Sequence, residues 1–159
     1  MINQQVSNYA VLTEFPRSNL QPNGDSASPK EMIFHILPDN SQDVSILDIG
    51  FGAGTLGKMV KSNQATSHWH IDGVDGWEPN CQNLDLFNQR IYRNVWHGLA
   101  QEIPSSELSK YKIICLLDVI EHLDIQTSKN LLKSLLTHLN TESYPVSYTH
   151  LTLPTKRIV

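Results

Sequence analysis

The chain has 159 residues, of which 40% are hydrophobic and 18% are charged, and its formal net charge is −4. This length and composition indicate one globular domain, and the acidic balance argues against a basic nucleic-acid footprint. No apolar run approaches the length of a membrane span, and the first residues lack a signal-peptide pattern, so we expect no membrane association.

The first 28 residues are polar, with many Asn, Gln, Ser and Pro residues and no regular apolar period. They predict an N-terminal extension, residues 1–28, for which a flap over the site and a disordered segment are the two alternatives. Ser28 and Pro29 then match an N-cap followed by proline at the first helical position. This pattern predicts a helix over residues 30–37, which Pro38 ends.

Residues Ile46–Gly57 read ILDIGFGAGTLG. A short apolar strand, about residues 44–49, leads into a glycine loop, and a helix is predicted over residues 55–62. Such a strand-to-loop passage places a binding site at the carboxyl edge of a parallel sheet. Glycines there let the backbone approach a ligand where a Cβ atom would collide.

Two alignments of this loop are open. Gly52, Gly54 and Gly57 match the dinucleotide pattern G-x-G-x-x-G, which would bury Asp48 inside the strand, a costly position unless the carboxylate is paired. The other alignment starts the turn at Gly50 and leaves Asp48 exposed at the strand tip, facing a cationic ligand end. We favour the second alignment, because two later segments agree with it.

The first of these segments is His70–Pro79, HIDGVDGWEP. It predicts a strand over about residues 69–74 with Asp75 at its end. Asp75 lies 21 residues beyond Gly54, the spacing of a second βα unit whose acidic residue binds ribose hydroxyls. A short helix over residues 79–87 and a third strand over residues 91–96 are expected to follow.

The second segment is Tyr111–Leu123, YKIICLLDVIEHL. Its continuous apolar run predicts a central parallel strand over residues 112–118, covered on both faces and ending at Asp118. His122 is expected at the start of the next helix. An amphipathic helix is predicted over residues 124–139, with a core stripe of leucines at positions 131, 132, 135, 136 and 139.

Alternating strand and helix signals predict an α/β fold with a Rossmann-like, doubly wound parallel sheet. The three segments, in this order, resemble the class I S-adenosylmethionine-dependent methyltransferase superfamily over about residues 29–146. That family has a seven-stranded sheet, whereas four strands are predicted before residue 140. We therefore expect the cofactor-binding part of a methyltransferase domain, truncated after about the fourth or fifth strand, with TESYPV leading into the fifth.

Residues 147–159, SYTHLTLPTKRIV, resemble a translated sequencing-adapter read. We expect them to be a non-native tail, and the alternative is a genuine basic C-terminus.

The resemblance implies a role for each of the candidate residues. The methionine portion of S-adenosyl-L-methionine would be held by Asp48, Gly50, Gly52 and Gly54, the ribose by Asp75, and the adenine by Trp77 and His97. Leu99 departs from the family pattern, because it cannot accept a hydrogen bond from the adenine amine. Asp118 would bind the amino group of the cofactor or orient the acceptor, and His122 would be the general base.

The favoured function is methyl transfer to a small metabolite or a glycan hydroxyl. An NAD-dependent oxidoreductase and a noncatalytic cofactor-binding module are the alternatives. Two cysteines fit free thiols in a reducing cytoplasm, and His68, His70 and Cys81 form too sparse a pattern to predict a metal site. The sequence defines neither the acceptor nor the oligomeric state.

Overall fold

The computed structural model describes residues 7–8, 30, 33–36, 43–138 and 144–148. The elements follow one another along the chain as β1 (Ser7–Asn8), α2 (Ile33–Ile36), β2 (Ser45–Ile49), α3 (Thr55–Ser62), β3 (His70–Asp75), α4 (Glu78–Cys81), α5 (Leu84–Asn88), β4 (Asn94–His97), η2 (Ala100–Glu102), α6 (Ser105–Leu108), β5 (Ile113–Leu117), η3 (Ile120–His122), α7 (Ile125–His138) and β6 (Tyr144–Tyr148).

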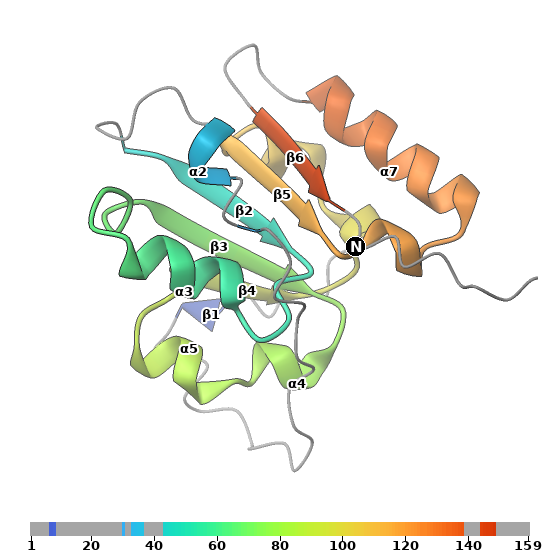
Figure 1. The fold of residues 1–159 in the computed structure, drawn as a ribbon. Helices are drawn as coiled ribbons and strands as arrows, with labels where there is room; N and C mark the ends of the chain where they lie inside the picture. The colour runs from blue at the N-terminus through green and yellow to red at the C-terminus, as the bar shows by residue number, and fades with distance from the viewer. Residues whose placement is uncertain (1–6, 9–29, 31–32, 37–42, 139–143, 149–159) are drawn as a thin grey trace, which may run out of the picture.

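The strands form one sheet in the order β1-β4-β3-β2-β5-β6 (Figure 1). The five strands from β4 to β6 in this order are parallel, and β1 pairs antiparallel with β4 at one edge. The chain runs outward from β2 through β3 to β4 and then returns to β5 on the other side of β2. This order is that of a Rossmann-like, doubly wound sheet, as the sequence predicted, and β2 and β5 flank its topological switch point.

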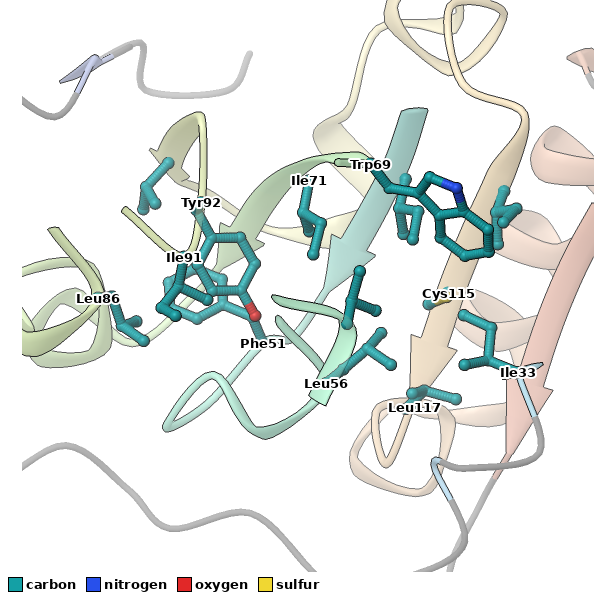
Figure 2. Packing of buried hydrophobic residues seen from close by; sticks show 14 of the residues in the cluster. Ile33, Phe51, Leu56, Trp69, Ile71, Leu86, Ile91, Tyr92, Cys115 and Leu117 are labelled. Atoms are coloured by element: carbon teal, nitrogen blue, oxygen red, sulfur yellow. The ribbon is translucent and has the colours of Figure 1, made fainter. Parts of the chain in front are cut away.

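Two apolar clusters cover the two faces of the sheet. One cluster joins α2, α3, α4 and α5 to the sheet through Ile33, Leu56, Val60, Cys81 and Leu86 (Figure 2). The other joins α6 and α7 to the opposite face through Leu108, Leu131 and Leu135. Every residue of β5 is buried, because both of its faces are covered, and this explains its uninterrupted apolar sequence.

Several predicted boundaries need correction. Helix α3 has the predicted bounds, whereas β4 begins at Asn94, three residues later than expected. The single helix predicted over residues 79–87 is two short helices, α4 and α5. The short helices η2 and α6 were not predicted from the sequence. Within the described residues, no helix combines the length and apolar character that crossing a membrane requires.

The leucine stripe of α7 is only partly correct. Leu131 and Leu135 are buried, Leu132 is half-buried, and Leu136 is 65% exposed, so the prediction that Leu136 belongs to the core is wrong. Leu139 lies outside the described residues. Because 3.6 residues make one turn, the neighbouring residues 135 and 136 point in different directions, and only one side of the helix faces the sheet.

The ends of the chain are described only in part. Ser7 and Asn8 of the predicted extension form β1, and the rest of residues 1–28 lies outside the described residues. Strand β6 lies beside β5, where a fifth parallel strand was expected, and its last two residues belong to the predicted tail. Residues 149–159 are outside the described part, and the division into residues 1–28, 29–146 and 147–159 stays a prediction.

Candidate functional site

The glycine loop begins where the favoured alignment predicts. Strand β2 ends at Ile49, and Gly50, Gly52 and Gly54 have φ angles of 72°, 57° and 78°, in the left-handed region that favours glycine. A Cβ atom at Gly50 would overlap the side chain of Val119, which follows β5. The loop therefore lies against the end of the neighbouring strand at the switch point.

Phe51 anchors this loop in the core. Its side chain is 2% exposed, and its ring centroid lies 5.1 Å from that of Tyr92 (Figure 2). Gly73 in β3 makes room for it, since a Cβ atom there would lie 2.6 Å from Phe51 Cδ1. The glycines thus flank a fixed aromatic side chain.

The prediction that Asp48 stands exposed at the strand tip is wrong. Asp48 lies within β2, in register with Gly73 and Cys115, and is 2% exposed. Strand alternation places it on the same face as Ile46, towards α3. The Tyr92 hydroxyl donates a hydrogen bond of 2.7 Å to Asp48 Oδ2, so the buried carboxylate is paired rather than directed at a ligand.

Asp75 lies at the end of β3, as predicted, and both of its oxygens contact the backbone. Oδ2 accepts a hydrogen bond of 2.9 Å from the Gly52 N–H, and Oδ1 accepts one of 2.7 Å from the Trp77 N–H. Burial raises the pKa of this carboxyl, an effect that the two N–H donors partly oppose. The Asn80 side chain also hydrogen-bonds to this carboxylate. A carboxylate has about four acceptor sites in all, so the group retains capacity for a ligand hydroxyl.

The residues near the end of β4 surround Gly76. His97, in register with Asp75, places its Nε2 atom 3.2 Å from the Gly76 carbonyl oxygen. Trp77 and Leu99 are partly exposed, at 43% and 47%. The strand ends thus bring a carboxylate, an imidazole and exposed apolar surface to one edge.

Asp118 follows β5 and has a φ angle of 56°, in the left-handed region. Its Oδ2 atom lies 3.6 Å from the Nζ atom of Lys30, in an ion pair whose side chains are 16% and 5% exposed. Sequence reasoning missed Lys30, because no local pattern links it to a residue 88 positions later. Tyr92, the partner of Asp48, was missed for the same reason.

His122 ends the short turn η3 and is exposed. The prediction that it opens the next helix is wrong, because His122 is the last residue of η3 and α7 begins separately at Ile125. Asp124 precedes α7 and accepts hydrogen bonds from the N–H groups of Gln126 and Thr127. These are the contacts of an N-cap.

Other polar groups lie apart from this edge. Asp72 is buried within β3, where Arg93, Asn94 and Tyr111 donate hydrogen bonds to it. His68 and His70 are exposed, and the described part of the chain contains no cluster of ligating side chains for a metal ion. A surface hollow of about 530 Å³ lies along α3 and is lined by Thr55, Lys58, Met59, Lys61, Ser62, Gln89 and Ile91.

Comparison with known proteins gives a consistent fold. No protein-family model and no curated protein sequence matches the chain. An S-adenosylmethionine-dependent methyltransferase from Clostridium acetobutylicum superposes on 78% of the chain with a TM-score of 0.61 and 15% identity. The amino pentose methyltransferase CalS10 from Micromonospora echinaspora, with S-adenosylmethionine bound, superposes on 80% of it with a TM-score of 0.58 and 16% identity.

A third similar structure is phosphoethanolamine N-methyltransferase 2 from Haemonchus contortus, in complex with phosphomonomethylethanolamine and S-adenosylhomocysteine. It superposes on 80% of the chain with a TM-score of 0.62 and 16% identity. The chain spans 50%, 52% and 28% of the lengths of these three structures, in the order given. The described domain thus has the fold of S-adenosylmethionine-dependent methyltransferases and corresponds to about half of such a structure, or less.

Proposed function

We propose that the chain is the cofactor-binding part of an S-adenosyl-L-methionine-dependent methyltransferase. The observation that carries this proposal is the junction between the glycine loop and Asp75, where the Gly52 N–H donates to the carboxylate at the end of the next strand. This junction lies at the carboxyl edge beside the switch point, where open α/β sheets bind their ligands. The shared fold with methyltransferases supports the choice of cofactor.

Each part of the cofactor has a candidate partner. The loop of Gly50, Gly52 and Gly54 would contact the methionine portion through its backbone, and Asp75 would accept hydrogen bonds from the ribose hydroxyls. Trp77 and His97 would pack against the adenine. Asp48 would support the loop rather than contact the cofactor, because its carboxylate is buried and hydrogen-bonded to Tyr92.

Positioning would supply most of the catalysis, because the sulfonium of the cofactor is already a good leaving group for an in-line displacement. Asp118, beside the loop, would bind the amino group of the cofactor. His122 is exposed in the turn after β5, where an imidazole can take a proton from an acceptor hydroxyl or amine. We propose it as the general base.

The acceptor class favoured is a small metabolite or a glycan hydroxyl. The net charge of −4 does not favour nucleic acid, and two of the similar structures carry names of enzymes for an amino pentose and for phosphoethanolamine. Two buried free thiols, Cys81 and Cys115, fit a reducing cytoplasm.

A second candidate, an NAD-dependent oxidoreductase, is favoured by Gly57. A Cβ atom at this position in α3 would lie 2.6 Å from Ile91 Cγ2 and 2.7 Å from Tyr92 Cζ. This close packing is the role of the third glycine in the dinucleotide pattern. The burial of Asp48 within β2, paired with Tyr92, also fits that pattern. Strand β2 nevertheless ends before Gly50, which is earlier than that pattern requires.

Calorimetric titration of the full chain with S-adenosylhomocysteine and with NAD separates these candidates. We expect binding of the first ligand only, and an Asp75→Ala variant should bind it about tenfold or more weakly, since charge-assisted hydrogen bonds are lost. Asp85→Ala, at an exposed position in α5, is the matched control. Binding of NAD without S-adenosylhomocysteine would overturn the proposal, and cofactor binding by a full-length parent that methylates nothing would favour a noncatalytic module.

A further inference from the structure

The ring of Tyr92 occupies a space that three glycines leave open. Tyr92 precedes β4 by two residues and is fully buried (Figure 2). A Cβ atom would lie 3.3 Å from Cε2 of this ring at Gly54, 2.7 Å from its Cζ at Gly57 and 3.1 Å from its Cδ1 at Gly73. These glycines belong to the end of the loop, to α3 and to β3, so a single ring packs against all three parts of the chain.

The same side chain is joined to the strand that enters the loop. Its hydroxyl donates a hydrogen bond of 2.7 Å to Asp48 Oδ2, in β2, which ends one residue later at Ile49. Its ring centroid lies 5.1 Å from that of Phe51, which is part of the loop itself. Tyr92 therefore contacts the strand before the loop, a side chain within it and the helix after it.

A second tyrosine makes an equivalent bond on the other face of the sheet. The Tyr111 hydroxyl donates a hydrogen bond of 2.7 Å to Asp72 Oδ2, and Asp72 is buried within β3. Asp72 is in register with Leu47, which belongs with Tyr111 to the apolar cluster of α6 and α7. The two tyrosines thus share the same bond to a buried strand carboxylate, and Tyr92 forms it on the face that carries the glycine loop.

We propose that Tyr92 is a positioning residue, which fixes the glycine loop in its ligand-binding conformation through Asp48 and Phe51. This inference rests on the proposed function, in which the loop contacts the methionine portion of the cofactor. A binding loop is held in place when the side chains behind it are locked by packing and hydrogen bonds. A loop that is already ordered loses less conformational entropy when the ligand binds. Tyr92 therefore contributes to the affinity for the methionine portion without contacting the ligand.

The test separates the part of the ligand that reaches the loop from the rest. Calorimetry on the full chain compares S-adenosylhomocysteine with methylthioadenosine, which has a methyl group in place of the amino-acid end. The wild type should prefer S-adenosylhomocysteine, because only this ligand extends to the loop. Tyr92→Phe, which keeps the ring and removes the hydroxyl, should reduce this preference by about three- to tenfold, the range of one hydrogen bond. Its affinity for methylthioadenosine should stay unchanged.

Tyr111→Phe is the matched control, because it removes a hydrogen bond of the same length to a buried carboxylate. Both substitutions should lower the midpoint of urea unfolding, whereas only Tyr92→Phe should change the ligand preference. A preference that Tyr92→Phe leaves unchanged, or that Tyr111→Phe reduces as much, overturns the inference. Equal binding of both ligands by the wild type also overturns it and leaves the proposed function intact. A wild type that binds neither ligand overturns the proposed function itself.

A second measurement needs no variant. In the free wild type, the Gly50 N–H donates to the Val74 carbonyl oxygen at 2.7 Å, and the Gly54 N–H donates to that of Phe51 at 2.8 Å. We expect hydrogen exchange at these two amides to be on the order of a hundredfold slower than in an unstructured peptide, because the loop is fixed before a ligand binds. Exchange at the rate of an unstructured peptide would overturn the inference.

Discussion

Gly50 meets two constraints that mutations can separate. Its φ angle of 72° is unfavourable for a residue with a side chain, and an added Cβ atom would overlap Val119. We predict that Gly50→Ala destabilises the fold by about 2–4 kcal/mol, from backbone strain of about 1–2 kcal/mol and the cost of overpacking. Urea unfolding measures this change.

A Val119→Ala substitution supplies the control, because it removes the side chain that the new Cβ atom would overlap. In the Gly50→Ala background it should restore part of the lost stability. The remaining deficit reports the backbone strain. Complete restoration would show that the φ angle costs nothing, and no restoration would show that Val119 is not the obstacle.

Asp75 should make ligand binding depend on pH. Burial raises the pKa of its carboxyl above the ordinary value of 3.8, and hydroxyl donors bind the ionised form. The affinity for S-adenosylhomocysteine should therefore fall with decreasing pH, starting at a higher pH than an ordinary aspartate would impose. Calorimetry between about pH 5 and pH 8 tests this. The same fall in an Asp75→Asn variant would assign the effect to another group.

The sequence located the candidate residues better than it located their partners. The end of β3 at Asp75 follows from the apolar pattern of the strand. The burial of Asp48 depends on Tyr92, which is 44 residues away in the sequence. Local patterns carry no information on such a contact, so the sequence predicted an exposed carboxylate where the structure has a buried one.

Helix α7 contains a matched pair of neighbouring leucines. Leu135 is 4% exposed and packs against the sheet, whereas Leu136 is 65% exposed. We predict that Leu135→Ala destabilises the fold by about 2–4 kcal/mol, because it leaves a cavity, and that Leu136→Ala changes stability by about 0.5 kcal/mol or less. Urea unfolding of both variants tests the assignment, and equal effects would contradict it.

The N-terminus of α7 should contribute a pH-dependent stability. Hydrogen bonds from the Thr127 hydroxyl and backbone lower the pKa of Asp124 below 3.8. A carboxylate with a lowered pKa stabilises the fold above its unfolded value, and this contribution is lost as the pH falls through the folded value. Asp124→Ala should therefore be less stable than the wild type at neutral pH. Unfolding curves should show the difference shrinking below about pH 4, and a difference that grows there would contradict the N-cap.

The elements were predictable where an apolar pattern, either periodic or continuous, extends over the whole element. Helix α3 has one buried face along its length, and every residue of strand β5 is apolar and buried. Helix α6 was not predicted, because its four residues, SSEL, include a single buried side chain, Leu108. Short helices that depend on the rest of the fold have no period of their own.

For the molecule as a whole, ligand binding should appear as added stability. A ligand that binds only the folded state at 100 times its Kd contributes about 2.7 kcal/mol to the free energy of unfolding. We predict that S-adenosylhomocysteine raises the Tm by about 5–10 °C under this condition, and that NAD at the same concentration does not. Thermal unfolding followed by circular dichroism measures both, with Asp75→Ala as the variant that should lose most of the shift.

The overall topology followed from the alternation of strands and helices, since right-handed crossovers leave few arrangements open. These rules account for the order of the strands on either side of the switch point. The pairing of Lys30 with Asp118 could not be predicted in this way. Lys30 precedes the parallel strands in the sequence, whereas Asp118 follows β5. Such contacts are properties of the assembled domain.

The buried side chain of Phe51 limits the flexibility that a glycine-rich loop would otherwise have. Its ring occupies the space that Gly73 leaves open, so the surrounding turn is pre-organised before any small molecule arrives. A ligand bound at this edge would meet an ordered loop, and the loop would lose little conformational entropy on association. Ligand binding at this edge would then require little rearrangement of the loop.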